Sequence, residues 1–79
     1  MIGHMEFDRK ADAIYISFSD KQVAYTKKLD DFRYVDFDDN DSVVGIELLN
    51  ISNVMQTNNL PDKAEIDVGL KQKGIKTYA

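Results

Sequence analysis

Residues 13–18 read Ala-Ile-Tyr-Ile-Ser-Phe, and this stretch decides the fold. Large apolar side chains recur at every second position, at Ile14, Ile16 and Phe18. A period of two in β-branched and aromatic residues is typical of a half-buried strand, whose other face here carries Tyr15. We therefore predict a strand over this stretch.

The same alternation recurs on both sides of this stretch. It predicts further strands at residues 6–7, 23–29, 33–37 and 43–49, separated by short polar turns rich in Asp, Asn and Ser. Strands joined in this way favour local antiparallel pairing. The fold class that we predict is mainly β (α+β), a small antiparallel meander sheet of four to five strands with one short helix.

One face of the predicted strands carries the apolar residues that should form the core. The predicted core consists of Ile14, Ile16, Phe18, Val35, Phe37, Val44, Ile46 and Leu48.

The pattern becomes weaker after residue 50. Ser52 is placed to cap a short helix that holds Val54 and Met55. Residues 62–70 alternate like a strand, but they follow a Pro-Asp pair that is a good helix start, and they also have apolar pairs at helical spacing. Gly69 favours the extended alternative.

The domain organisation follows from these elements. Residues 1–4 resemble a cloning remnant or a disordered extension, so the only histidine, His4, is a poor candidate for acid–base or metal chemistry. We expect a single β-rich domain at residues 5–60. Residues 61–79 form a tail that adds one strand or one helix, with a frayed end.

Composition excludes several classes of function. The 79 residues include no cysteine, which excludes disulfides, thiolate zinc sites and cysteine nucleophiles and suits a reducing cytoplasm. The net charge of −4 opposes nucleic-acid binding. No apolar run approaches the roughly 18 residues of a membrane span. We expect a cytoplasmic protein with no cofactor, no nucleic-acid partner and no membrane contact.

Two motifs resemble a known family. Residues 7–16, Phe-Asp-Arg-Lys-Ala-Asp-Ala-Ile-Tyr-Ile, and residues 35–49, Val-Asp-Phe-Asp-Asp-Asn-Asp-Ser-Val-Val-Gly-Ile-Glu-Leu-Leu, resemble the "ADALYI" strand and the "LDYDEDGxLVGIEIL" hairpin of the domain of unknown function 2283. The resemblance runs over residues 7–51. It implies a small sheet with little helix and no established reaction. It also implies an antitoxin-like or partner role, because some members are encoded beside small toxin-like proteins. Asp41 stands where the family usually has glycine.

The acidic turn within residues 36–47 is the one candidate for metal binding. Its oxygen-bearing side chains follow the spacing of an EF-hand loop, but glycine is missing at the sixth position and the flanks are strands rather than helices. A solvated β-turn explains the pattern better. A divalent-cation-dependent binding or hydrolytic function remains the alternative, and the candidate ligands for it are Asp38, Asp39 and Asp41.

Tyrosines are the other candidate functional residues. Tyr15 and Tyr34 point away from the predicted core, and Tyr25 can join either face. Exposed tyrosines suit protein contacts, because they bury a large area and keep a polar tip. No Ser-His-Asp set or phosphate-binding glycine loop is present. The sequence thus favours a non-enzymatic interaction module, an antitoxin-like partner of a small basic protein or a homodimer, with these tyrosines as its interaction surface.

Overall fold

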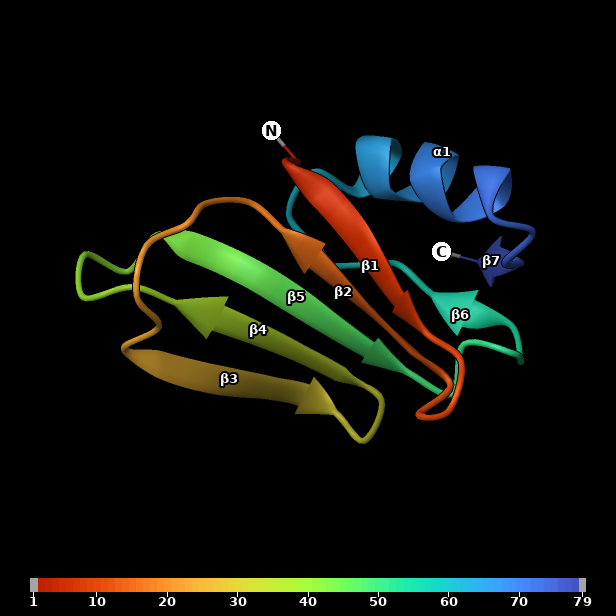
Figure 1. Cartoon of the computed structure of the whole chain (residues 1–79), viewed down its shortest axis with the longest axis horizontal. Coiled ribbons are helices and arrows are strands. Elements are labelled where there is room, and N and C mark those ends of the chain that lie inside the picture. Colours follow the sequence, from red (N-terminus) through yellow and green to blue (C-terminus); the bar gives the residue numbers. More distant parts are fainter. Residues whose placement is uncertain (1, 79) are drawn as a thin grey trace.

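The computed structural model of the protein describes residues 2–78 (Figure 1). Five antiparallel strands and one helix confirm the predicted mainly β, α+β class. The sheet consists of β1 (His4–Asp8), β2 (Ala13–Ser17), β3 (Tyr25–Asp30), β4 (Arg33–Phe37) and β5 (Val43–Leu49).

The strand order in the sheet is β1-β2-β5-β4-β3. The pairs β1–β2, β3–β4 and β4–β5 are local hairpins, as a meander requires. The order departs from a continuous meander after β2, which pairs with β5 and not with β3. The chain passes from β2 around the end of the sheet to the far edge and returns through β4, so β5 lies in the middle (Figure 1).

The register of the three central strands builds the core. Ile16 pairs with Ile46, which pairs in turn with Val35, and Ile14 pairs with Leu48. Side chains of a strand alternate between faces, so these residues share one face of the sheet. Full burial of each contributes roughly 1.5–3 kcal/mol before conformational entropy is subtracted. The buried members of the predicted core are Ile14, Ile16, Val35, Val44, Ile46 and Leu48, whereas Phe18 and Phe37 are half-buried.

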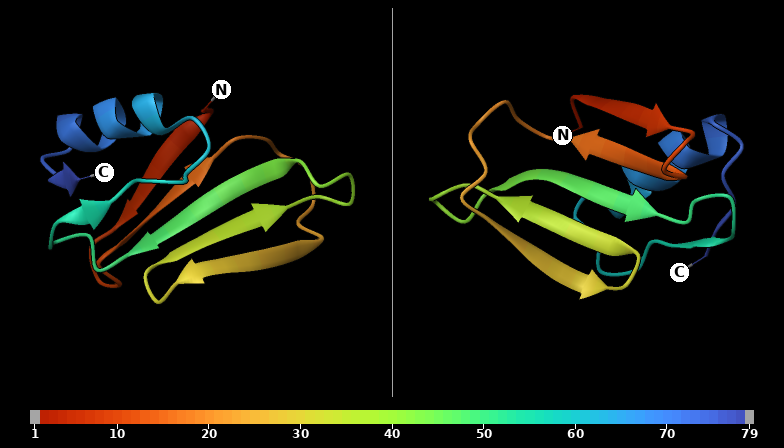
Figure 2. Two further views of the ribbon diagram at one scale, coloured as in Figure 1. Left: turned by 180° about the vertical axis from the view of Figure 1, so that it is seen from behind. Right: turned by 60° about the horizontal axis from the view of Figure 1, so that its bottom comes forward.

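A second layer covers this face. It contains the helix α1 (Lys63–Gln72) and a small parallel pair formed by β6 (Met55–Gln56) and β7 (Thr77–Tyr78) (Figure 2). Sequence patterning did not assign its residues to the core, because they come from short or ambiguous segments. The buried apolar residues that this region adds are Ile51, Met55, Leu60, Ile66 and Leu70.

The predicted helix at Ser52 is wrong. Ser52 lies in a turn, where its amide and hydroxyl both donate hydrogen bonds to the carboxylate of Asp12, with 2.7 Å between Ser52 Oγ and Asp12 Oδ2. Val54 lies in the loop that follows, and Met55 begins β6. The cap signal of Ser52 is thus used by a residue that is 40 positions away in the sequence.

The preference for an extended segment at residues 62–70 is also wrong, because α1 occupies it. Ile66 and Leu70, one helical turn apart, are fully buried, whereas Val68 stays 57% exposed. An ion pair of 2.7 Å between Lys63 and Asp67 joins successive turns. Gly69, which favoured the extended alternative, allows close helix packing instead: a Cβ there would lie 2.8 Å from Met5 Sδ.

The ends of the described chain are part of the fold. Strand β1 includes His4, and the Gly3 amide donates a hydrogen bond of 2.6 Å to the Ser17 carbonyl. Strand β7 lies in the predicted tail. Met1 of the expected extension and Ala79 of the expected frayed end lie outside the described residues.

No helix in the described part of the chain is long and apolar enough to span a membrane. The helix α1 has 10 residues, too few to cross a bilayer.

Candidate interaction surfaces

The face of the sheet opposite α1 is not covered by any described segment (Figures 1 and 2). Cross-strand register places one row of side chains along it, in the order Glu6, Tyr15, Glu47, Tyr34 and Lys28. Asp36 and Thr26 lie in the neighbouring row. We call these seven residues the open face.

Tyr15 is held in one position on the open face. Its hydroxyl donates a hydrogen bond of 2.7 Å to Asp36 Oδ2, and Thr26 donates to the other oxygen of the same carboxylate. The ring lies over Gly45, where a Cβ would come within 2.6 Å of Tyr15 Cε2. Burial raises the pKa of the Tyr15 hydroxyl well above 10.0, and the hydrogen bond to Asp36 and the negative charges of Asp36 and Glu47 raise it further. The hydroxyl therefore stays protonated and remains a donor.

Glu47 stands at the centre of the open face. It pairs across the strands with Tyr15 on one side and with Tyr34 on the other. Both tyrosines are half-buried, whereas Glu47 is exposed. An exposed carboxylate flanked by two aromatic side chains can accept hydrogen bonds from a guanidinium or ammonium group while the rings contact its apolar part.

Tyr25 does not lie on the open face. It stacks on Phe37, with ring centroids 5.1 Å apart, and Phe37 belongs to the side that carries the core. Its hydroxyl donates a hydrogen bond of 2.6 Å to Asp41 Oδ1, the main reason that its pKa is raised. The structure thus brings together Tyr15 and Tyr34 and places Tyr25 on the opposite face.

The acidic turn is organised by its own backbone. The Asp38 side chain accepts hydrogen bonds from the amides of Asn40 and Ser42, at 2.8 and 2.9 Å. The Ser42 amide lowers the pKa of Asp38, although burial opposes the shift, and the Asn40 amide lowers it further. Asp41 adopts a positive φ of 62°, a conformation that glycine would adopt more easily.

This arrangement leaves few carboxylate oxygens of the acidic turn available to coordinate a cation. Asp38 is occupied by amides, Asp41 accepts from Tyr25, and Asp39 remains exposed. Among residues 2–78, no three Asp, Glu or His side chains converge as a metal site requires. The geometry therefore gives no support to the cation-dependent alternative.

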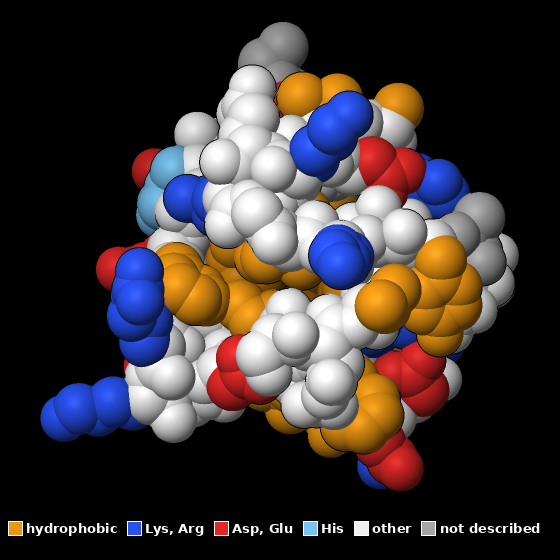
Figure 3. All heavy atoms as spheres, turned by 90° about the vertical axis from the view of Figure 1, so that its right-hand side faces the viewer, with side chains coloured by type: hydrophobic (Ala, Val, Ile, Leu, Met, Phe, Trp, Pro, Cys, Tyr) orange, Lys and Arg blue, Asp and Glu red, His pale blue; other side chains and the backbone are white. Residues whose placement is uncertain are grey.

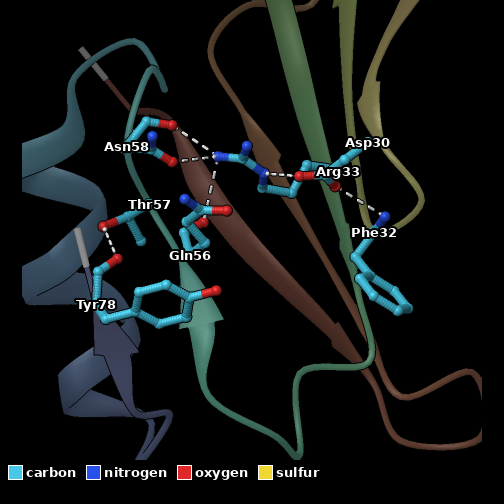
Figure 4. A network of polar contacts seen from close by, with 7 residues as sticks. All are labelled: Asp30, Phe32, Arg33, Gln56, Thr57, Asn58 and Tyr78. Atoms are coloured by element: carbon cyan, nitrogen blue, oxygen red, sulfur yellow. Dashed lines mark hydrogen bonds and ion pairs between the residues drawn. The ribbon is translucent and has the colours of Figure 1, made fainter.

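A polar network that sequence analysis missed surrounds Arg33 (Figure 4). The side chain is buried and links the sheet to the second layer: Nε donates to Asp30 Oδ2 at 2.8 Å, and Nη1 donates to the Asn58 carbonyl at 2.6 Å. Asp30 also accepts from the Phe32 amide. A signal existed in the sequence, because Arg33 alternates in phase with Val35 and Phe37 and so had to point inward.

Residues 4–52 match the model of the family described as "Protein of unknown function (DUF2283)". This match covers β1 to β5 and ends before the second layer begins. No curated protein and no solved structure is significantly similar to the chain.

Proposed function

The chain belongs to the DUF2283 family of unknown function, and on that premise we propose that it is a non-enzymatic protein-interaction module whose open face binds a basic protein. Cytoplasmic location and an antitoxin-like role, in which a small basic partner is held by this face, are part of the proposal. The absence of cysteine from the sequence supports the location.

The observation that carries the proposal is the charge of the uncovered sheet face. It presents three carboxylates, on Glu6, Asp36 and Glu47, and one lysine, Lys28. Asp36 is shared by two hydroxyl donors, which leaves Glu47 and Glu6 accessible to a partner. A surface of this sign steers and orients a basic partner.

Glu47 and its two tyrosine neighbours are the centre of this surface. Tyr15 is already fixed by its hydrogen bond to Asp36, so a partner spends little conformational entropy in ordering it. Tyrosine and arginine pairs dominate the binding energy of many interfaces. An arginine of the partner is therefore the side chain best matched to the Tyr15–Glu47–Tyr34 row.

A homodimer through the same face is less favourable. A two-fold axis near Glu47 would bring equal carboxylates together, and like charges in a desolvated interface cost free energy. The open face therefore suits a different, basic protein better than a second copy.

The proposal is tested by nuclear magnetic resonance with a simple basic probe. A peptide that alternates arginine and alanine is titrated into the isotopically labelled protein, and we expect saturable amide shifts confined to β2, β4 and β5. Glu47→Lys should abolish these shifts, whereas Asp20→Lys, the same change of charge in the loop between β2 and β3, should preserve them. The dispersion of each spectrum reports that the variant is folded.

Shifts spread evenly over all acidic segments, or shifts that survive Glu47→Lys, would refute the proposal. Purification of the tagged protein from its native host gives a second measurement. A strictly monomeric protein recovered without any basic companion would count against the proposed partner.

A further inference from the structure

A second surface lies at the end of the molecule where α1 ends. Two adjoining hollows of about 750 and 500 Å³ meet there and share Val54, Ile75 and Lys76. Figure 3 shows this side, with apolar side chains gathered around a depression and Lys and Arg side chains around its rim. We call this surface the apolar groove. Its apolar lining consists of Phe7, Ile51, Val54, Val68 and Ile75.

The apolar groove exposes large side chains to water. Val54 is 53% exposed, Val68 is 57% exposed and Phe7 is 43% exposed. Val68 belongs to α1 and Val54 to the loop before β6, so segments distant in the sequence combine at this site. Contiguous exposed apolar side chains rimmed by polar groups mark interaction sites.

The rim of the apolar groove is basic. Arg9, Lys71, Lys73 and Lys76 line the two hollows, and within residues 2–78 none of these four forms an ion pair. Two carboxylates also line the hollows: Asp67 is paired with Lys63, whereas Asp12 accepts from Ser52 and keeps its negative charge. A positive rim is therefore left on a chain whose net charge is −4.

We propose that the apolar groove binds an acidic segment of a partner protein that carries spaced apolar side chains. The apolar side chains of that segment fill the two hollows, on either side of Val54 and Ile75. Its carboxylates meet the four cations of the rim, which form no ion pair within residues 2–78. The apolar groove borders the open face at Phe7 and Arg9, which also line a hollow with Glu6, Tyr15 and Glu47. The proposal nevertheless does not rest on the function proposed above, because it involves a different partner chemistry.

Other occupants fit the surface less well. A bilayer needs apolar side chains that protrude, whereas this surface is hollowed, and the negative net charge is repelled by anionic lipid. The same charge disfavours nucleic acid, and among the lining residues only Phe7 offers an aromatic ring for base stacking. Two copies joined groove to groove would set four cations against four.

The experiment uses fluorescein-labelled peptides in which leucines are interspersed with glutamates, at helical spacing in one peptide and at extended spacing in another. We expect fluorescence anisotropy to show saturable binding of one of them to the full chain. We also expect no binding of the matching peptides with lysine in place of glutamate. Val68→Glu should weaken the binding by about tenfold or more, equivalent to about 1.4 kcal/mol. Val23→Glu, the same change at an exposed valine in the loop between β2 and β3, should leave it unchanged.

Lys76→Glu provides a second variant that keeps the test valid if Val68→Glu perturbs α1, which circular dichroism would reveal. Glu47→Lys on the open face should leave peptide affinity unchanged, so that the two proposed surfaces can fail separately. The inference is overturned if neither acidic peptide binds, or if Val68→Glu and Lys76→Glu both bind as well as the wild type. It is also overturned if phosphatidylserine vesicles bind the chain and the acidic peptides do not.

Discussion

Gly45→Ala tests how the open face is built. Gly45 lies beneath the ring of Tyr15, and the added methyl group would overlap the Tyr15 hydroxyl and approach Cε2 to 2.6 Å. The backbone of β5 is held by pairing on both sides, so it cannot move away. The Tyr15 ring must therefore swing outward, and its 2.7 Å hydrogen bond to Asp36 breaks.

The expected cost follows from two opposing effects. A hydrogen bond to a charged acceptor contributes about 1.5–3 kcal/mol, and the lower figure applies here because Tyr15 is only half-buried. Alanine in a strand gains about 0.5–1 kcal/mol over glycine, because the unfolded chain loses less entropy. The net destabilisation is about 0.5–1 kcal/mol, equivalent to a fall of about 2–8 °C in Tm for a domain of this size.

The assay is urea unfolding of four proteins: wild type, Gly45→Ala, Tyr15→Ala and the double variant. We expect Gly45→Ala to lower the midpoint in the wild-type background and to be neutral or slightly stabilising in the Tyr15→Ala background, where no ring remains to collide. That difference is the coupling free energy between the two positions. Equal effects of Gly45→Ala in both backgrounds would show that the glycine serves the backbone and not the tyrosine, and would refute this reasoning.

Three further results are expected. Arg33→Lys should lower stability by about 1.5–3 kcal/mol in chemical unfolding, since lysine cannot reach Asp30 and the loop carbonyl together, and unchanged stability would mean that the network contributes nothing. Acid titration followed by circular dichroism should show stability present above pH 3.8 and lost as the pH falls further. The reason is that the folded pKa values of Asp30, Asp38 and Asp67 all lie below that ordinary value, and the Asp67→Asn variant should lose less of its stability over the same range. Gly74→Ala should lower the free energy of unfolding by about 1 kcal/mol in thermal unfolding. Gly74 has a φ of +79° and open space around its Cα, so backbone strain alone would cause this loss. A neutral result would indicate that the end of the helix relaxes.

The sheet could be predicted from the sequence because period-two alternation is a local signal. Ile14 and Ile16, and Ile46 and Leu48, mark the same buried face in any antiparallel pairing. The pairing of β2 with β5 could not be predicted in this way, because it joins residues about 30 positions apart and no turn between them fixes the register.

The second layer was harder to predict because its signals conflict locally. Residues 62–70 suit a strand by alternation and a helix by spacing, and the helix is the alternative that buries Ile66 and Leu70 against the rest of the core. Similarly, Ser52 is a residue type that often caps helices, but here its hydroxyl donates a hydrogen bond to Asp12. Such contacts between distant residues leave no mark in a single sequence.

The candidate site was predicted in part. Alternation alone placed Tyr15 and Tyr34 together, because each strand has only two faces. Tyr25 escaped that reasoning, since the phase of its strand is set by Phe37 across the hairpin. The apolar groove was not predicted, because its lining comes from four separate segments.

One-sided coverage of the sheet separates the residues of the open face from those that keep the molecule folded. The side chains of Glu47, Tyr34 and Glu6 lie on the face opposite the buried residues beneath α1, so these positions can vary without changes to the interior. The exception is the Gly45 and Tyr15 pair, where a contact surface and a backbone requirement coincide. In related sequences we therefore expect Glu47, Tyr34 and Glu6 to vary and the Gly45 and Tyr15 pair to be conserved.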